Sequence, residues 1–215
     1  MTSKLLGQKM TLGEREKRSF ALPDLRAESE GGIVRGHAAV FDQRVTIGGW
    51  FEEIIERTAF AKTDFRDVVM TVNHNLQNIP LARSRNNNAN STLQLSVDDA
   101  GLYIRAALDI ENNSESRALH ASIVRQDITG MSFIFIIRDA IWENLDSDMP
   151  TRRITDIARV IEVSAVSFPA YDGTDISARD QETLESAKAA LESARSGLES
   201  PKSELELLKA KLKLR

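Results

Sequence analysis

Three residues far apart in the sequence carry side chains that together can perform acyl transfer: His74, Ser132 and Glu162. A serine hydroxyl is a poor nucleophile until a base within hydrogen-bond reach removes its proton. The base in turn needs a group that fixes its tautomer and stabilises the imidazolium. Only tertiary folding can bring these side chains together, so their spacing does not distinguish a serine hydrolase from three separate structural roles.

Ser132 is the only polar side chain in a run of β-forming residues at 130–137. This run predicts a strand that is buried on at least one face. A buried hydroxyl without a partner costs about 1–3 kcal/mol, so Ser132 needs either a hydrogen-bond partner or a task. A satisfied small polar residue in a strand is therefore the alternative to a nucleophile.

Glu162 is the only ionisable residue in the apolar run at 161–166. An unpaired buried carboxylate costs several kcal/mol or takes up a proton, so Glu162 needs a cation or a hydrogen-bond donor. An imidazole N–H would serve. His74 follows a predicted strand at residues 67–73, where several asparagines indicate a turn. A histidine at the end of a strand is well placed for chemistry.

The other two histidines favour structural roles, since His37 lies within a predicted strand and His120 on a predicted helix. No pair of histidines has the H-x-x-x-H spacing of a zinc site. The phosphate-binding G-x-x-x-x-G-K-[ST], dinucleotide-binding G-x-G-x-x-G and hydrolase G-x-S-x-G motifs are absent from the sequence. We therefore expect no metal and no cofactor.

The composition excludes several further classes of protein. The sequence has no cysteine, which rules out disulfides, thiolate metal sites and a cysteine nucleophile. A net charge of -4 gives no basis for a nucleic-acid partner. No apolar stretch approaches the ~20 residues that span a bilayer, and residues 1–10 lack the apolar region of a secretory signal. We expect a cytosolic protein without a membrane partner.

The hydrophobic pattern predicts an α+β fold that is mainly β. We expect an edge strand or arm near Phe20 and strands at residues 33–41, 67–73, around Ser132 and at 154–168. Alternating apolar residues predict a β-hairpin at 91–108.

A helix is expected from Ser114 to about Arg125, with Asn113 or Ser114 as its cap and with Leu119 and Ile123 facing inward.

The sequence divides into a flexible segment at residues 1–13, a domain at 14–178 and a helical tail at 179–215. Leucine and alanine recur in the tail with heptad spacing that loses one position at Pro201. Alanine at several of these positions makes the heptad pattern weak. The tail has two interpretations that the sequence leaves open: a helix docked on its own domain, or an arm that binds a partner.

Several blocks of the sequence resemble the prohead proteases of tailed bacteriophages, which are the serine proteases of capsid maturation. The blocks keep the order of that family over about residues 14–175. The most specific are Asn-His at 73–74, Gly-Met-Ser-Phe at 130–133, and Glu-Val-Ser followed by Pro-Ala-Tyr within 162–171. Asn75, Ile134 and Asp172 depart from the residues usual in the family, but none of them removes a side chain that the mechanism needs.

The resemblance implies that Ser132 is the nucleophile and His74 the general base. Glu162 is our choice for the third member, because its burial independently calls for a partner. The resemblance also implies a compact β-barrel with surrounding helices, like that of the herpesvirus assembly protease. An oxyanion hole is required, and its donors are backbone N–H groups or one of the arginines nearby in sequence: Arg138, Arg152, Arg153 and Arg159.

The substrates implied by the resemblance are the scaffolding domain or delta domain of the major capsid protein, and the protease itself. Its partners would then be the capsid protein and a second copy of the chain, inside the immature prohead in the host cytoplasm. The helical tail would tether the enzyme to helical scaffold and be removed by self-cleavage.

Two other functions are compatible with the sequence. One is a non-catalytic capsid assembly or scaffold protein, with the β domain as a docking module and the tail as an oligomerisation helix. The other is an esterase or amidase that uses the same serine and histidine on small substrates.

Overall fold

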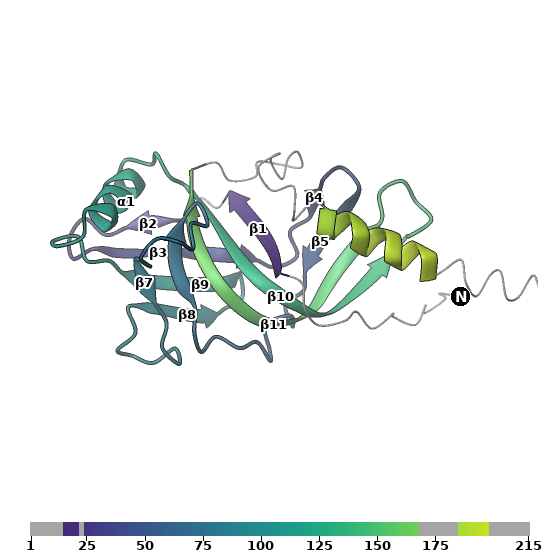
Figure 1. Ribbon diagram of the computed structural model, residues 1–215, viewed down its shortest axis with the longest axis horizontal. Helices are drawn as coiled ribbons and strands as arrows, with labels where there is room; N and C mark the ends of the chain where they lie inside the picture. Colours follow the sequence, from purple (N-terminus) through teal and green to yellow (C-terminus); the bar gives the residue numbers. More distant parts are fainter. Residues whose placement is uncertain (1–14, 22–23, 168–184, 198–215) are drawn as a thin grey trace, which may run out of the picture.

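The computed structural model describes residues 15–21, 24–167 and 185–197, which form a mainly β structure with two helices (Figure 1). The predicted flexible segment at 1–13 and the predicted domain boundary at 178 lie outside the described residues. The boundaries of the predicted domains therefore stay predictions.

The larger of two sheets is built on β10 (Gly130–Glu143) and β11 (Thr151–Val166), an antiparallel pair of long strands that curves through the molecule (Figure 1). Its strand order is β1-β10-β11-β5-β4, with β6 beside β11 and β7 beside β6. The other strands are β1 (Arg15–Ala21), β4 (Val45–Ile47), β5 (Phe51–Ile55), β6 (Val69–Val72) and β7 (Ala82–Arg83).

The smaller sheet has the order β2-β3-β9-β8. It comprises β2 (Arg26–Ala27), β3 (Ile33–Val40), β8 (Leu93–Val97) and β9 (Gly101–Ala107). The hairpin expected at 91–108 is confirmed by the antiparallel pairing of β8 with β9. Gly36 lets another segment approach β3 closely, because a Cβ at this position would lie 2.9 Å from the Leu25 Cα.

The two sheets pack around one hydrophobic core, to which both contribute buried side chains. Met131 and Phe133 on β10 and Val163 on β11 belong to this core. Because side chains alternate between the faces of a sheet, Ser132 and Glu162 project from the opposite face of the larger sheet. The alternation that builds the core therefore also gathers the polar residues of these strands on one side.

The expected closed β-barrel is wrong. A barrel closes when its outermost strands pair with each other. Among the described strands, β1, β4 and β7 are edges and none of them pairs with another edge. Both β5 and β6 run parallel to β11, β5 along Thr151–Ile154 and β6 along Glu162–Ala165. Two different strands therefore pair with successive parts of β11, and the sheet does not close into a barrel.

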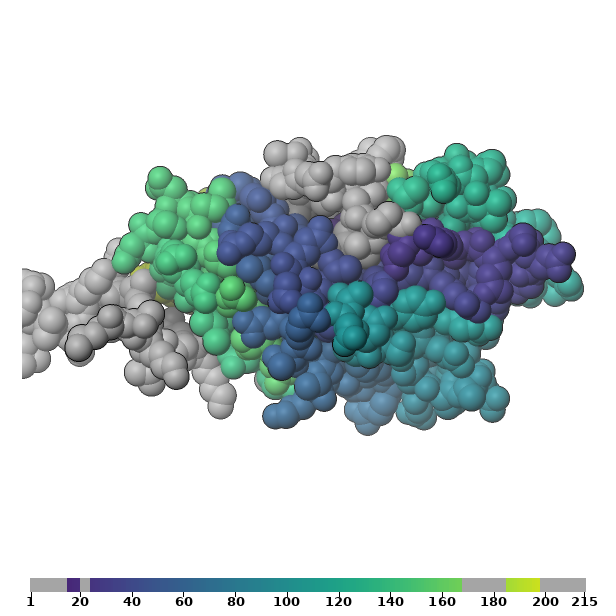
Figure 2. Space-filling model, turned by 180° about the vertical axis from the view of Figure 1, so that it is seen from behind, coloured from purple at the N-terminus to yellow at the C-terminus, as the bar shows by residue number. Residues whose placement is uncertain are grey.

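The two described helices lie toward opposite ends of an elongated body (Figure 1). In the view from behind, the teal residues around α1 (Ser114–Val124) lie at one end and the green end of the β10–β11 hairpin at the other (Figure 2). Asn113 caps α1 by accepting hydrogen bonds from the Glu115 and Ser116 N–H groups, and Leu119 and Ile123 are buried as expected. Neither described helix is long and apolar enough to cross a membrane.

The second helix spans residues 185–197, within the predicted tail. Its Ala187 and Leu191 are buried against Ile47 of β4 and Phe51 of β5. Its Arg195 also donates hydrogen bonds to the carbonyl oxygens of Leu145 and Ser147, which follow β10. This part of the tail is docked on the β-structure of its own chain; residues 198–215 lie outside the described residues.

Candidate active site

His74 and Glu162 meet at the end of β6. This strand runs parallel to β11, with Val69 opposite Glu162 and Val72 opposite Ala165. His74 follows β6 by two residues and turns its ring back, so that Nδ1 lies 2.8 Å from Glu162 Oε2. The Glu162 side chain is fully buried and that of His74 is 10% exposed. An imidazole is thus the partner that burial of Glu162 calls for.

The backbone at this turn has a rare conformation. Asn73 and His74 have φ angles of 50° and 59°, in the left-handed region that residues with a Cβ seldom adopt. Asn73 is held by β11, because its N–H donates to the Ala165 carbonyl and its side-chain oxygen accepts from the Ser167 N–H. Such strain persists only where the surrounding contacts impose it, and it often marks a functional site.

Two hydroxyl groups that the sequence analysis missed complete this pair. Thr71 Oγ1 donates to Glu162 Oε1 at 2.5 Å, and Ser164 Oγ accepts from the His74 backbone N–H at 3.0 Å. The two hydroxyl oxygens lie 3.1 Å apart and both side chains are buried. The signal that could have found them is the one used for Ser132, a polar side chain within a predicted buried strand.

The second ring nitrogen of His74 is left open. His74 Nε2 is buried and has no hydrogen-bond partner among the described residues. An ionised carboxylate only accepts hydrogen bonds, so when Glu162 is ionised its contact with Nδ1 places the proton on Nδ1 and leaves Nε2 as an acceptor. A buried acceptor without a donor is costly, and it is also what a general base requires.

Ser132 lies one strand away from this group. It is directly opposite Ser164 in the β10–β11 ladder, and Ser164 is in turn opposite Thr71 of β6. Opposite side chains of an antiparallel pair have Cβ atoms about 4.5–5.5 Å apart on the same face. The hydroxyl of Ser132 is fully buried and donates to the Arg18 carbonyl at 2.7 Å. This hydroxyl forms no hydrogen bond with His74, so the structure brings two of the three predicted residues into contact and places the third on the adjacent strand.

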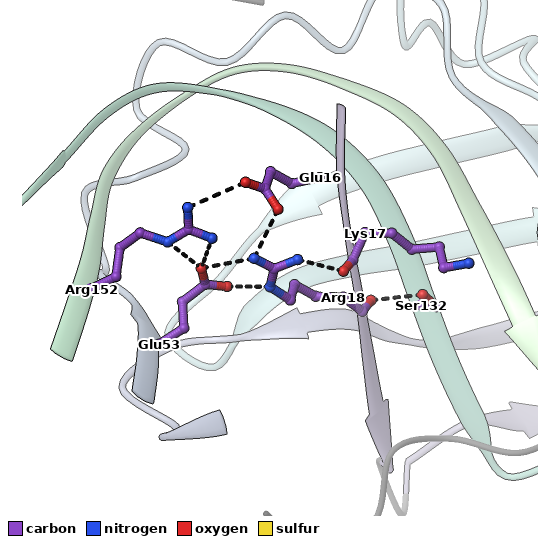
Figure 3. A network of polar contacts seen from close by, with 6 residues as sticks. All are labelled: Glu16, Lys17, Arg18, Glu53, Ser132 and Arg152. Carbon is purple, nitrogen blue, oxygen red and sulfur yellow. Dashed lines mark hydrogen bonds and ion pairs between the residues drawn. The ribbon is translucent and has the colours of Figure 1, made fainter. Parts of the chain in front are cut away.

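A cluster of buried charges holds β1, and with it the carbonyl of Arg18, against the rest of the sheet (Figure 3). The cluster consists of Glu16 and Arg18 of β1, Glu53 of β5 and Arg152 of β11, each at most 3% exposed. Arg18 Nη2 lies 2.9 Å from Glu53 Oε2 and 2.9 Å from Glu16 Oε2. Arg152 Nε donates to Glu53 Oε2 at 2.7 Å, and its Nη1 to Glu16 Oε1 at 3.2 Å.

Burial opposes ionisation of Glu53, but the charges of Arg152 and Arg18 outweigh it and hold the pKa of this carboxyl below its ordinary value. Burial likewise opposes the charge on Arg18, but Glu53 and Glu16 outweigh it and raise the pKa of the guanidinium. Two cations and two anions thus compensate one another in the interior.

Three of the four arginines considered as oxyanion donors are paired with carboxylates. Arg138 pairs with Asp156, Arg152 belongs to the buried cluster, and Arg153 pairs with Glu143 and Glu56. Arg159 is exposed. Hydrogen bonds from Arg66 lower the pKa of Asp64, burial opposes them, and the charge of Arg159 adds a smaller lowering.

The other two histidines lie in structural settings. His37 sits between two carboxylates, with Nδ1 2.5 Å from Asp24 Oδ2 and Nε2 3.0 Å from Asp98 Oδ2. His120 is buried on α1, with Nε2 2.7 Å from the Glu28 carbonyl. Among the described residues, no group of three or more histidine or acidic side chains is arranged to hold a metal ion.

Comparison with known proteins places the chain in one family. No curated protein and no solved structure matches the chain. The relation to the fold of the herpesvirus assembly protease therefore stays a prediction. A family model described as caudovirus prohead serine protease matches residues 21–189, which include His74, Ser132 and Glu162. This range spans most of the chain, and the family consists of serine endopeptidases that act in capsid maturation. The chain therefore belongs to the caudovirus prohead serine proteases.

Proposed function

We propose that this protease cleaves peptide bonds with Ser132 as nucleophile, His74 as general base and Glu162 as the group that orients His74. The observation that carries the proposal is the buried His74–Glu162 pair with its open Nε2. In a serine–histidine–acid triad, the acid fixes one nitrogen of the base and the other nitrogen is free to take the proton of the nucleophile.

In the proposed reaction, Ser132 Oγ attacks the scissile carbonyl carbon while its proton passes to His74 Nε2. Collapse of the tetrahedral intermediate breaks the carbon–nitrogen bond, and Nε2 returns the proton to the leaving amine. Water then hydrolyses the acyl-enzyme through the same base. Glu162 accepts the Nδ1–H throughout and stabilises the imidazolium that forms in each step.

Ser132 must first release the carbonyl of Arg18. A hydroxyl has one proton to donate, and in this structure the proton points to Arg18 O. Rotation about the Cα–Cβ bond of Ser132 redirects the hydroxyl without moving β10. Catalytic hydrogen bonds often form only when substrate is bound, so the contact with Arg18 is compatible with a nucleophile at rest.

The proposed substrates are the scaffolding or delta domain of the major capsid protein and the protease itself, inside the immature prohead in the host cytoplasm. Membership of the prohead protease family supports a capsid-protein substrate. Self-cleavage, dimerisation and a tethering role for the tail at residues 179–215 belong to the same proposal.

Co-expression with the cognate major capsid protein tests the function. We expect the wild type to shorten the capsid protein, and Ser132→Ala and His74→Ala to leave it at full length. Ser122→Ala is the matched control, because the hydroxyl of this α1 residue bonds the Ala118 carbonyl and the Arg125 side chain and no residue of the proposed site. Shortening that survives both active-site substitutions would contradict the proposal. A scaffold function predicts another outcome: the wild type leaves the capsid protein at full length, and the wild type and both variants support capsid assembly equally.

Intact-mass measurement over time tests self-cleavage. The wild type is expected to lose mass and Ser132→Ala to keep its full mass. Equal masses for the two proteins throughout would contradict self-cleavage and would leave the proposed cleavage of the capsid protein untouched.

A further inference from the structure

A closed ring of hydrogen bonds joins four residues around the turn after β6: Thr71, His74, Glu162 and Ser164. His74 takes part through both its imidazole and its backbone N–H. Thr71 gives its single proton to Glu162, since a carboxylate only accepts. Ser164 must then be the donor to Thr71 across their 3.1 Å contact. The Ser164 oxygen accepts the His74 backbone N–H, and the His74 ring gives Nδ1–H to Glu162. His74 therefore contributes two donors to this ring of hydrogen bonds, its backbone N–H and its Nδ1–H.

We propose that Thr71 and Ser164 are positioning residues for catalysis, which fix His74 in the orientation and tautomer that leave Nε2 open. This inference rests on the proposed roles of His74, Glu162 and Ser132. Thr71 acts on the carboxylate, because it holds the oxygen of Glu162 that His74 does not use. Ser164 acts on the backbone, because it bonds the N–H of the residue whose side chain is the base.

The left-handed backbone at Asn73 and His74 shows why such support is needed. A conformation of this kind costs about 1–3 kcal/mol per residue and relaxes unless other contacts oppose it. If the backbone of His74 relaxed to the β region, the imidazole of His74 would move away from Glu162. Ser164 Oγ is the acceptor that the described residues provide for the His74 N–H, so it opposes this relaxation directly.

The position of Ser164 connects the ring of hydrogen bonds with the proposed nucleophile, Ser132. Ser164 lies between Ser132 on β10 and Thr71 on β6 in one row of opposite residues. All three hydroxyl side chains are buried on the face of the sheet that carries Glu162. The ladder that sets the register of β10 against β11 therefore also sets the distance between Ser132 and the base.

The test uses the rate of labelling by a fluorophosphonate probe, which reacts with activated serine hydroxyls. Thr71→Val and Ser164→Ala each remove one hydroxyl with little change in volume. We expect each to lower the maximal labelling rate about 10- to 100-fold, with unchanged probe affinity, because the lost hydrogen bonds orient the base and do not contact the probe. Thr71→Ser keeps the hydroxyl and is expected to restore most of the rate.

Thr155→Val is the matched control. Thr155 lies on the same strand as Ser164, and its buried Oγ1 has no hydrogen-bond partner among the described residues. This variant should label like the wild type. If Thr71→Val and Ser164→Ala label as fast as Thr155→Val, the two hydroxyls have no positioning role and the inference is overturned.

A spectroscopic measurement on the wild type tests the hydrogen-bond ring even where a variant does not fold. In protein with ¹⁵N-labelled histidine, the Nδ1–H of His74 should give a downfield proton signal protected from solvent, assigned by its loss in His74→Gln. The signal is expected in the wild type, and to weaken or shift in any folded ring variant but not in Thr155→Val. Its absence from the wild type would overturn the ring.

The failure of this inference can be told apart from failure of the proposed function. If Ser132→Ala or His74→Ala labels normally, the proposed catalytic roles are wrong, and the inference falls with them. If these two lose labelling while the ring variants keep it, only the inference fails. A probe adduct on Ser164 in place of Ser132 would make Ser164 a nucleophile and would overturn its positioning role.

Discussion

At the scale of single residues, the cost of burying polar groups explains most of the site. Glu162 is buried and accepts from two donors, and Ser132 is buried and donates to a carbonyl. Both needs were predictable from an ionisable or polar residue within an apolar run. The identity of the partner of Ser132 was not predictable, because Arg18 offers its backbone carbonyl and the sequence gives no sign of a carbonyl in that position.

His37 provides a pH-dependent contribution to stability. Burial disfavours the charged imidazolium, but hydrogen bonds and charges from Asp24 and Asp98 outweigh it and raise the pKa of His37 above 6.5. A raised pKa in the folded state means that the stabilisation is fully present below about pH 6.5 and is lost as the pH rises through the folded value. We expect His37→Gln to be less stable than the wild type at pH 5.5 and closer to it at pH 9.

Urea unfolding across this pH range measures the effect as the difference in unfolding free energy between the two proteins. The denaturant slope of both should stay the same, so that the change reports stability and not compactness. A difference that is constant from pH 5.5 to pH 9 would show that the His37 carboxylate contacts do not depend on its charge.

At the scale of elements, the buried charge cluster joins β1 to β5 and β11, two strands with which β1 has no ladder. Glu16 and Arg18 belong to a charged segment that composition alone would leave in solvent, yet both are buried by their pairing with Glu53 and Arg152. Pairing between residues so distant in the sequence cannot be predicted from periodicity. The cluster holds β1 at the edge of the sheet, where a barrel would instead have closed through backbone hydrogen bonds.

Two neighbouring glutamates on β5 allow the contribution of a buried ion pair to stability to be compared with that of an exposed one. Glu53→Gln leaves the charges of Arg18 and Arg152 without a full counter-charge in the interior, and we expect it to lower the unfolding free energy by about 3–5 kcal/mol. Glu52→Gln breaks a pair with Arg44, whose side chains are 30% and 56% exposed, and should cost about 0–1 kcal/mol. Chemical denaturation of the two variants measures both values. Equal costs would mean that burial of the cluster contributes nothing special to stability.

The cap of α1 gives a second prediction at this scale. The sequence left Asn113 and Ser114 as alternatives, and the structure has Asn113 as the cap, with its side chain bonded to two N–H groups. Asn113→Ala should therefore cost about 1 kcal/mol and Ser114→Ala much less. A thermal or urea melt of each variant decides between them, and the reverse order of stabilities would place the cap on Ser114.

Other elements show where local patterns fail. The hairpin at 91–108 and α1 were predicted because each is set by local periodicity and turn residues. The three-residue strand β4 (Val45–Ile47) is not among the strands expected from the sequence, since it is too short to show alternation. Gly48 and Gly49, with φ angles of 58° and 72°, provide the turn that pairs it with β5.

At the scale of the whole molecule, the pairing of the strands is the part of the fold that could not be predicted from the sequence. The sequence predicts the longest strands, but the parallel pairing of both β5 and β6 with β11 depends on contacts between distant segments. That pairing prevents closure of a barrel. It also places β6 beside the end of β11, so that His74 meets Glu162.

The helix at residues 185–197 adds a small second core to the molecule. Leu191 is 5% exposed and packs with Ile47 and Phe51. Leu191→Ala should lower the unfolding free energy by about 2–3 kcal/mol if the helix unfolds together with the sheet. Glu192→Ala, which changes an exposed residue of the same helix, is the control. An unfolding free energy equal to that of the control would show that the helix detaches from the body at little cost.

The most direct test of the central claim is peptide mapping by mass spectrometry after fluorophosphonate labelling of the full-length protein. The proposed catalytic roles predict a single adduct on Ser132 in the wild type, and no adduct in His74→Ala. Labelling of another residue, or labelling of Ser132 that does not require His74, would contradict them.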